Sequence, residues 1–266
     1  MNIYKFEMKR LLGSILTWSI TIAVMLLFLM KGFYPAMMES REAVEKIFAN
    51  FPPEMLIAFG MDVERMFSYE GFLSFSNIYI GLLSAMMAVS IALQIFAREK
   101  RDKCTDFLFT RPVTRSQVFV AKFLAGITCL LTFAVLYGAT VFWDFNAQNA
   151  TPLYENSLMY YILSPFLTML VFFVFATLYA LFSKRVRTIA GTATAFAFGA
   201  FVLSGLVDLL EKDFLKYVAP LDYFQTGYVL EHGHFDSSLV LTAAVVCVLG
   251  SAVSFWWYHS HDVQVA

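Results

Sequence analysis

Long apolar runs separated by short polar stretches make up most of this chain. Six of these runs reach the length of ~20 residues that a helix needs to cross a bilayer. We expect membrane-spanning helices at residues 14–34, 73–97, 118–143, 158–183, 188–210 and 239–258. The pattern predicts an all-α, polytopic membrane protein that forms a single transmembrane domain over residues 1–266.

The residues before the first span have a different pattern. Over residues 2–12, apolar side chains fall on one helical face and the basic side chains lie elsewhere; the apolar set is Tyr4, Met8, Leu11 and Leu12. This pattern is typical of an amphipathic helix that lies in the membrane interface. We therefore expect an interfacial helix followed by the first span.

The stretch between the first two spans is polar. Residues 39–46 predict a short solvated helix that ends before Pro52-Pro53. Residues 55–59 are apolar but too short to span, and we expect them to rest on the outer surface or to form a shallow re-entrant piece. Pro165 is expected near the start of the fourth span, where its missing N–H costs least.

The basic residues predict the orientation of the spans. With both termini inside, thirteen of the nineteen Lys and Arg residues lie in the cytoplasm. These are Lys5, Lys9, Arg10, Arg98, Lys100, Arg101, Lys103, Arg111, Arg115, Lys122, Lys184, Arg185 and Arg187. Since cytoplasmic loops carry an excess of Lys and Arg, we expect both termini in the cytoplasm.

Composition agrees with a membrane protein. The chain is 59% hydrophobic and only 15% charged, with a mean hydropathy of +0.67. A soluble domain has roughly 45–50% apolar and 25% charged residues. Ionisable residues are nearly absent from the expected spans, and Asp144 and Asp208 lie at span ends. This pattern disfavours a carrier coupled to protons or ions.

Several chemical motifs do not occur. The sequence has no Gly-x-x-x-x-Gly-Lys-Ser/Thr phosphate loop, no His-Glu-x-x-His zinc motif and no Gly-x-Ser-x-Gly nucleophile motif. We expect that the chain is not an enzyme, that it holds no cofactor or metal, and that any ATP is used by another polypeptide. His232 and His234 lie close to Glu231 and Asp236, and we favour a solvated loop over a metal site there.

A charged segment separates the second and third spans. Residues 98–106 read Arg-Glu-Lys-Arg-Asp-Lys-Cys-Thr-Asp, and residues 107–115 read Phe-Leu-Phe-Thr-Arg-Pro-Val-Thr-Arg. The segment is too charged for lipid and must emerge into water. With Lys122, it resembles the signature of the type-two ATP-binding-cassette (ABC) exporter permeases, with Cys104 at a position where Gly is usual. Residues 218–224 and Asp262-Val263 are more weakly similar to the same family.

This resemblance implies a permease subunit in the membrane lipid, paired with an identical or related second permease. Two cytoplasmic ATPase subunits would bind ATP and Mg, and no nucleic acid partner is expected. The charged segment would form a coupling helix that contacts the ATPase. Its expected coupling residues are Glu99, Thr105, Phe107, Leu108, Phe109, Pro112 and Arg115. Glu99 would form polar contacts, residues 107–109 would form an apolar anchor, and Arg115 with Lys122 would lie at the lipid headgroups.

Small residues recur at four-residue spacing in the fifth span. Gly191, Ala195 and Gly199 would let a helix approach closely, either within the subunit or at a dimer interface. By resemblance, the second and fifth spans border the transport path. Their aromatic and apolar content, with few charges, favours a hydrophobic or amphipathic cargo, such as a peptide, drug or lipid. The resemblance implies export of this cargo, and we expect the protein in a bacterial plasma membrane. A non-transporting sensor and a membrane-embedded enzyme remain the alternatives.

Overall fold

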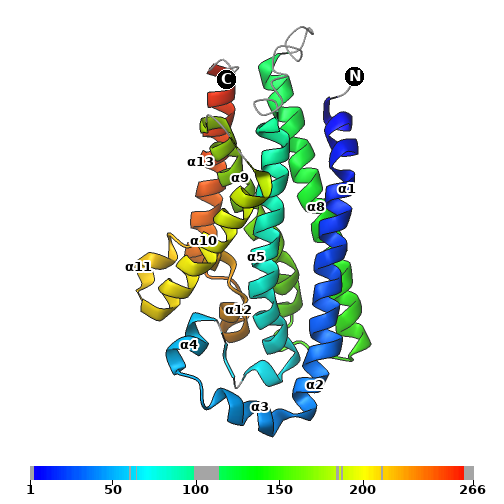
Figure 1. The fold of residues 1–266 in the computed structure, drawn as a ribbon, viewed down its shortest axis with the longest axis vertical. Helices are drawn as coiled ribbons and strands as arrows, with labels where there is room; N and C mark the ends of the chain where they lie inside the picture. The colour runs from blue at the N-terminus through cyan, green and yellow to red at the C-terminus, as the bar shows by residue number, and fades with distance from the viewer. Residues whose placement is uncertain are drawn as a thin grey trace.

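The computed structural model describes residues 3–59, 61–63, 65–98, 114–183, 186, 188–210 and 212–260. These residues form helices joined by turns (Figure 1). Six helical stretches among them are long and apolar enough to cross a membrane. They are Ile3–Glu39, Tyr69–Phe96, Arg115–Ala147, Ser157–Phe182, Ile189–Leu210 and Ser237–Ser260. The all-α fold with six spans is therefore confirmed.

The spans form an elongated bundle around α5 (Tyr69–Phe96). This helix packs against α9 (Ser157–Phe182), α10 (Ile189–Leu210), α1 (Ile3–Leu27) and α8 (Arg115–Ala147). Both ends of the described chain lie at one end of the bundle, which we call the terminal end, and the opposite end is the distal end (Figure 1). Helix α1 (Ile3–Leu27) packs on α8 (Arg115–Ala147), and α13 (Ser237–Ser260) packs on α9 and α8.

Helix α1 is continuous from residue 3 to residue 27, so residues 3–12 are the first turns of the span and not a separate interfacial helix. One buried stripe runs along the whole helix and includes Glu7, Leu11, Ile15, Ser19, Ile22 and Leu26. The spacing of three to four residues places this stripe on one helical face, which packs against α8 and α5. The sequence predicted a separate interfacial helix at residues 2–12, and this prediction is wrong. The helices that bury this part of α1 lie far along the chain, so the local pattern of residues 2–12 does not contain them.

The first span then continues through a π-helical segment, η1 (Phe28–Phe33), into α2 (Tyr34–Glu39). Pro35 stands in the first turn of α2 and has no N–H to donate. The Tyr34 N–H bonds the carbonyl of Leu29, five residues back, in place of the usual four. The π-helical turn therefore lies directly before the proline, with one residue more per turn than an α-helix.

Short helices cover the distal end. The expected helix at residues 39–46 is found as α3 (Arg41–Phe48), and the apolar residues 55–59 fall largely in α4 (Pro53–Ala58), which packs against α10. The other short elements are η2 (Arg65–Phe67), α11 (Asp213–Lys216), η3 (Asp222–Phe224) and α12 (Thr226–His232). These pieces bring residues from three parts of the sequence to the distal ends of α5 and α10.

Pro165 lies inside α9 and not near its start as the sequence predicted. A proline there cannot donate to the carbonyl of Tyr161, four residues earlier. The side-chain amide of Asn77 on α5 donates to that carbonyl at 3.3 Å instead. Neighbouring helices satisfy freed backbone groups in this way when a membrane helix carries a proline.

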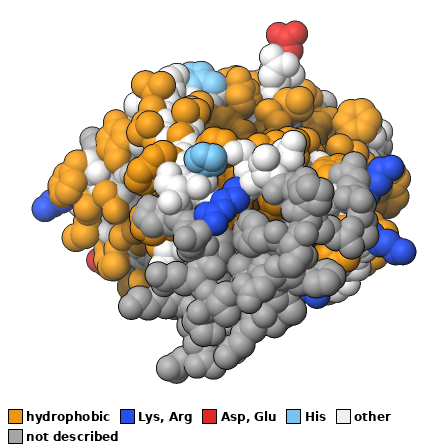
Figure 2. Space-filling view, turned by 90° about the horizontal axis from the view of Figure 1, so that it is seen from above, with side chains coloured by type: hydrophobic (Ala, Val, Ile, Leu, Met, Phe, Trp, Pro, Cys, Tyr) orange, Lys and Arg blue, Asp and Glu red, His pale blue; other side chains and the backbone are white. Residues whose placement is uncertain are grey.

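Large apolar side chains cover the circumference of the bundle. Phe28 is 67% exposed, Val135 is 70% exposed and Val248 is 68% exposed, on three different helices. Figure 2 looks onto the terminal end, where hydrophobic side chains form most of the described outline and Lys and Arg side chains appear at the rim and near the middle. Such a surface fits lipid around the helices, with charge concentrated at their ends.

Candidate functional site

Most of the expected coupling residues lie outside the described residues. These are Glu99, Thr105, Phe107, Leu108, Phe109 and Pro112. The structure shows the two helix ends that bound this segment. Helix α5 ends at Phe96 and α8 begins at Arg115, and both ends lie at the terminal end of the bundle (Figure 1).

A capping box begins α8. The Thr114 hydroxyl accepts a bond from the Gln117 N–H at 3.4 Å, and the Gln117 side chain accepts one from the Thr114 N–H at 3.2 Å. This reciprocal pair satisfies two amide donors that a helix start leaves without partners. The start of α8 is therefore well defined at Arg115, which is the one expected coupling residue that the structure describes.

Lys122 lies inside the bundle, which corrects the expectation that it reaches lipid headgroups. Its side chain is only 1% exposed, and its ammonium donates to the carbonyl of Ile95 at 3.3 Å. Arg10 of α1 donates to the neighbouring carbonyl of Gln94 at 2.6 Å and pairs with the Glu7 carboxylate at 2.7 Å. Two cations from two helices thus bond the last turn of α5, directly before the coupling segment.

A second polar cluster connects α5 to α8 and α9 in the distal half of the bundle. The Glu70 carboxylate is 4% exposed and accepts bonds from the Leu153 N–H at 2.9 Å and the Ser157 hydroxyl at 2.6 Å. Farther along α5, Asn77 Oδ1 accepts the Tyr137 hydroxyl at 2.5 Å. The sequence did not predict these contacts, because Glu70 precedes the expected start of the span at residue 73.

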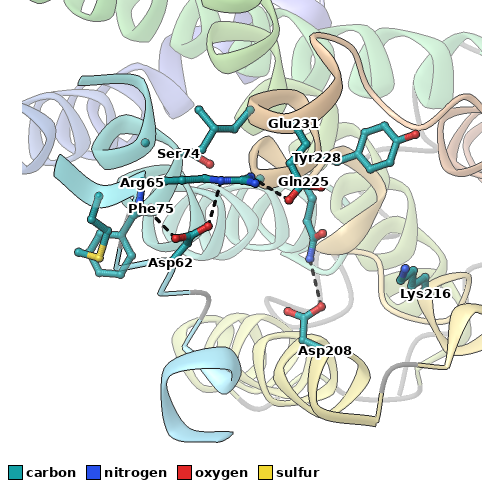
Figure 3. A pocket seen from close by; sticks show the side chains of 13 residues that line it. Asp62, Arg65, Ser74, Phe75, Asp208, Lys216, Gln225, Tyr228 and Glu231 are labelled. Atoms are coloured by element: carbon teal, nitrogen blue, oxygen red, sulfur yellow. Dashed lines mark hydrogen bonds and ion pairs between the residues drawn. The ribbon is translucent and has the colours of Figure 1, made fainter. Parts of the chain in front are cut away.

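A pocket of about 310 Å³ opens at the distal end between α5, α10, α12 and the chain before α5 (Figure 3). The Arg65 guanidinium lies on one wall, where it pairs with Asp62 at 3.1 Å and bonds Glu231 at 2.8 Å. Asp208 and Lys216 lie on the opposite wall (Figure 3). The described lining thus has three carboxylates and two cations, and Arg65 lies between the carboxylates of Asp62 and Glu231. The excess of negative charge makes the pocket more suited to a cationic group than to an anion.

Asp222 lies beside this pocket in η3 and is only 2% exposed. Burial raises the pKa of this carboxyl to about 7; the hydroxyl of Ser204 donates to it and opposes the rise, and the nearby Asp208 carboxylate adds to it. The Gln225 amide donates to Asp222 at 3.2 Å and to Asp208 at 3.5 Å. The two carboxyls therefore share one donor at the distal end of α10.

The small residues of the fifth span lie on an exposed face of α10. Gly191, Ala195 and Gly199 are exposed, whereas Ala193 and Ala197 are buried in the bundle. A Cβ added at Gly199 would meet nothing within 4 Å. The expected close packing of this stripe is therefore not made by the described residues of the same chain, and a dimer interface stays a prediction.

The two histidines of the distal loop pack against an aromatic side chain. The rings of His232 and Tyr228 stack at 4.1 Å, and the rings of His232 and His234 lie 6.3 Å apart. Within the described part of the chain, no group of three or more His, Cys, Asp or Glu side chains is placed to hold a metal ion. The contacts are those of a surface loop, and the histidines have no assigned chemistry.

Six apolar helices that cross a membrane, with buried polar contacts between them, define a multi-pass membrane protein. A family model described as "ABC-2 family transporter protein" matches residues 1–262, and the chain belongs to this family. It is thus a membrane permease subunit of an ABC transporter, a family in which a partner subunit carries the ATPase. A comparison with curated proteins finds no match.

Proposed function

We propose that this permease exports a hydrophobic or amphipathic cargo, such as a peptide, drug or lipid, and that a separate ATPase drives it through residues 99–113. Two cytoplasmic ATPase subunits would bind ATP and Mg, and two permease copies, identical or related, would enclose the path. Both termini would lie in the cytoplasm of a bacterial cell with the permease in its plasma membrane.

One observation carries this proposal. Residues 99–113 connect the end of α5, which is the most buried of the spans, to the capped start of α8. Because α5 packs against α9, α10, α1 and α8, a displacement of its end is transmitted to most of the bundle.

The aromatic and apolar lining of α5 and α10 supports the choice of cargo. Phe75 and Tyr79 of α5 form a ring contact, and Tyr79 contacts Phe201 of α10 at 6.3 Å. The two helices expected to border the path thus meet through aromatic side chains. The pocket at their distal ends, with Asp208 and Lys216 in its wall, would receive a polar headgroup as cargo leaves.

The test begins with purification of the intact permease from its native membrane to recover an ATP-binding-cassette ATPase, followed by reconstitution of both in vesicles. Glu99→Gln and Leu108→Ala should each lower the coupled ATPase rate about tenfold, the effect of losing roughly 1.4 kcal/mol at an interface. Glu39→Gln at the distal end and Leu153→Ala, at an exposed leucine, are matched controls and should leave the rate unchanged.

Failure of the proposal has two distinct forms. If the intact permease retains no ATPase, or if Glu99→Gln and Leu108→Ala leave the rate unchanged, the coupling assignment is wrong. ATP-dependent uptake of an amphipathic dye and of a fluorescent phospholipid into inverted vesicles separates exporter from sensor. A sensor would respond to these probes without moving them.

A further inference from the structure

The last carbonyl groups of a helix can accept hydrogen bonds from side chains of neighbouring helices. In α5 the Leu93 carbonyl accepts the Ala97 N–H at 3.0 Å, and the carbonyls of Gln94 and Ile95 follow it along the helix. Arg10 donates to the first of these at 2.6 Å, and Lys122 donates to the second at 3.3 Å. Positive charge is favourable at this end of a helix because its dipole is negative there.

The two cations come from different helices. Lys122 on α8 is 1% exposed, whereas the Arg10 side chain on α1 is 22% exposed and pairs with Glu7, which is 3% exposed. Burying a charge costs several kcal/mol unless its partners compensate. The position of Lys122 is therefore explained by its contact with α5 and not by an excess of positive charge at a cytoplasmic surface.

Further contacts tie the same three helices to one another at the terminal end. The Gln94 amide of α5 donates to Ser14 of α1 at 3.4 Å, and the Tyr4 hydroxyl of α1 donates to Thr128 of α8 at 3.1 Å. Phe96 of α5 contacts Phe119 of α8 with ring centroids 5.5 Å apart. Each pair among α1, α5 and α8 is thus joined directly.

We propose that Arg10 and Lys122 are positioning residues that fix the end of α5 to α1 and α8, so that these three helices move as one body when the ATPase displaces residues 99–113. This inference rests on the proposed function. Sliding α5 alone would separate two cations from their carbonyl acceptors in an apolar setting, where lost partners are costly. Moving the three helices together keeps every one of these bonds.

The test measures whether motion reaches α1. Spin labels at Lys9→Cys on α1 and Phe182→Cys on α9, both exposed, are placed in a chain without its native cysteines, co-purified with its ATPase. In the wild-type background we expect the distance between the labels to shift when nucleotide is trapped. In Lys122→Met, and in Glu7→Gln combined with Arg10→Met, the shift should fall to less than half.

Controls separate positioning from folding. Lys122→Arg keeps the cation and should restore the shift, and Lys5→Gln removes an exposed charge from α1 and should not alter it. A merely structural role would change the nucleotide-free distance between the labels, which we expect to stay as in the wild type. Met has nearly the length of Lys and fills its buried volume.

The outcomes are distinct. If no ATPase co-purifies with the wild type, the proposed function fails and this inference falls with it. If the ATPase is retained and the label distance shifts equally in wild type, Lys122→Met and Glu7→Gln/Arg10→Met, then α1 moves without these contacts and the inference is wrong. It is also wrong if the wild-type distance does not respond to nucleotide at all.

Discussion

Asn77 supplies the donor that Pro165 removes from the backbone of α9, and it accepts the hydroxyl of Tyr137 on α8 as well. Asn77→Leu would leave two buried polar groups without partners. We expect it to lower the free energy of unfolding by about 1–3 kcal/mol. Thermal unfolding in detergent measures this, and Asn146→Leu at an exposed asparagine should be close to neutral.

A second substitution tests whether the Asn77 amide compensates for the N–H that Pro165 lacks. Pro165→Ala restores an N–H that can bond the carbonyl of Tyr161 within α9. The double variant Asn77→Leu/Pro165→Ala should therefore be more stable than Asn77→Leu alone, with non-additivity of about 0.5 kcal/mol or more. Equal stability of the two would show that the Asn77 amide does not compensate for the proline.

Asp222 should make the stability of the protein depend on pH. Its pKa is raised to about 7 in the fold from the ordinary 3.8, so the folded protein binds the proton more strongly than the unfolded chain. The contribution of Asp222 to the free energy of unfolding is therefore fully present below pH 3.8. It falls as pH rises, by about 1.4 kcal/mol per pH unit at most, until the loss is complete above pH 7.

The measurement is the melting temperature in detergent from pH 5 to pH 8. Wild type should lose stability across this range, and Asp222→Asn, which keeps acceptors for Ser204 and Gln225, should give a flatter profile. Asp236→Asn is the matched control, since the Ser238 hydroxyl lowers the pKa of this partly exposed carboxyl, which contributes no such loss in this pH range. A wild-type profile as flat as that of Asp222→Asn would contradict the assignment.

The sequence did not predict which charged residues are buried. The sequence places Lys122 among the basic residues at the start of a span. In the structure it lies inside the helix bundle, where it donates to the Ile95 carbonyl of another helix, 27 residues away. Glu70 reads as part of a polar connection, yet its donors lie more than 80 residues away in and before α9. Contacts this distant in sequence leave no local periodicity.

The elements themselves were largely predictable. The expected span at residues 158–183 is observed at Ser157–Phe182, and that at 188–210 is observed at Ile189–Leu210. This agreement arises because bilayer thickness sets the apolar length of each helix. The continuation of α1 into residues 3–12 depends on packing against other helices, and hydropathy alone does not contain that information.

The exposed small residues of α10 predict an interface between two permease copies. If Gly191, Ala195 and Gly199 face a second permease, Gly199→Leu should reduce the dimeric fraction several-fold, because a large side chain blocks close helix approach. The fold of one chain should be unaffected, since an added Cβ at Gly199 meets nothing within 4 Å. Chemical crosslinking in native membranes measures the dimer.

The control for this change is Val248→Leu, at a 68% exposed position of α13, which should leave the dimer intact. Loss of crosslinking in both variants would indicate general misfolding, which the melting temperature would also show. An unchanged dimer in Gly199→Leu would mean that the stripe faces lipid.

At the scale of the whole molecule, an even number of spans places the two described chain ends together at the terminal end, with α3 at the distal end (Figure 1). Charge decides which end faces the cytoplasm, and the terminal side carries thirteen of the nineteen Lys and Arg residues when residues are assigned by the expected spans. The proposed coupling requires the same orientation, because cytoplasmic ATPase subunits would have to reach residues 99–113.

Labelling of single cysteines in intact cells tests this orientation directly. In a chain without native cysteines, Lys46→Cys on the exposed surface of α3 should react with a membrane-impermeant maleimide in intact cells. Lys5→Cys, exposed at the start of α1, should react only after the cells are permeabilised. The reverse result would place residues 99–113 outside the cell, where no ATPase could reach the end of α5, and the proposed coupling could not operate whatever the family of the chain.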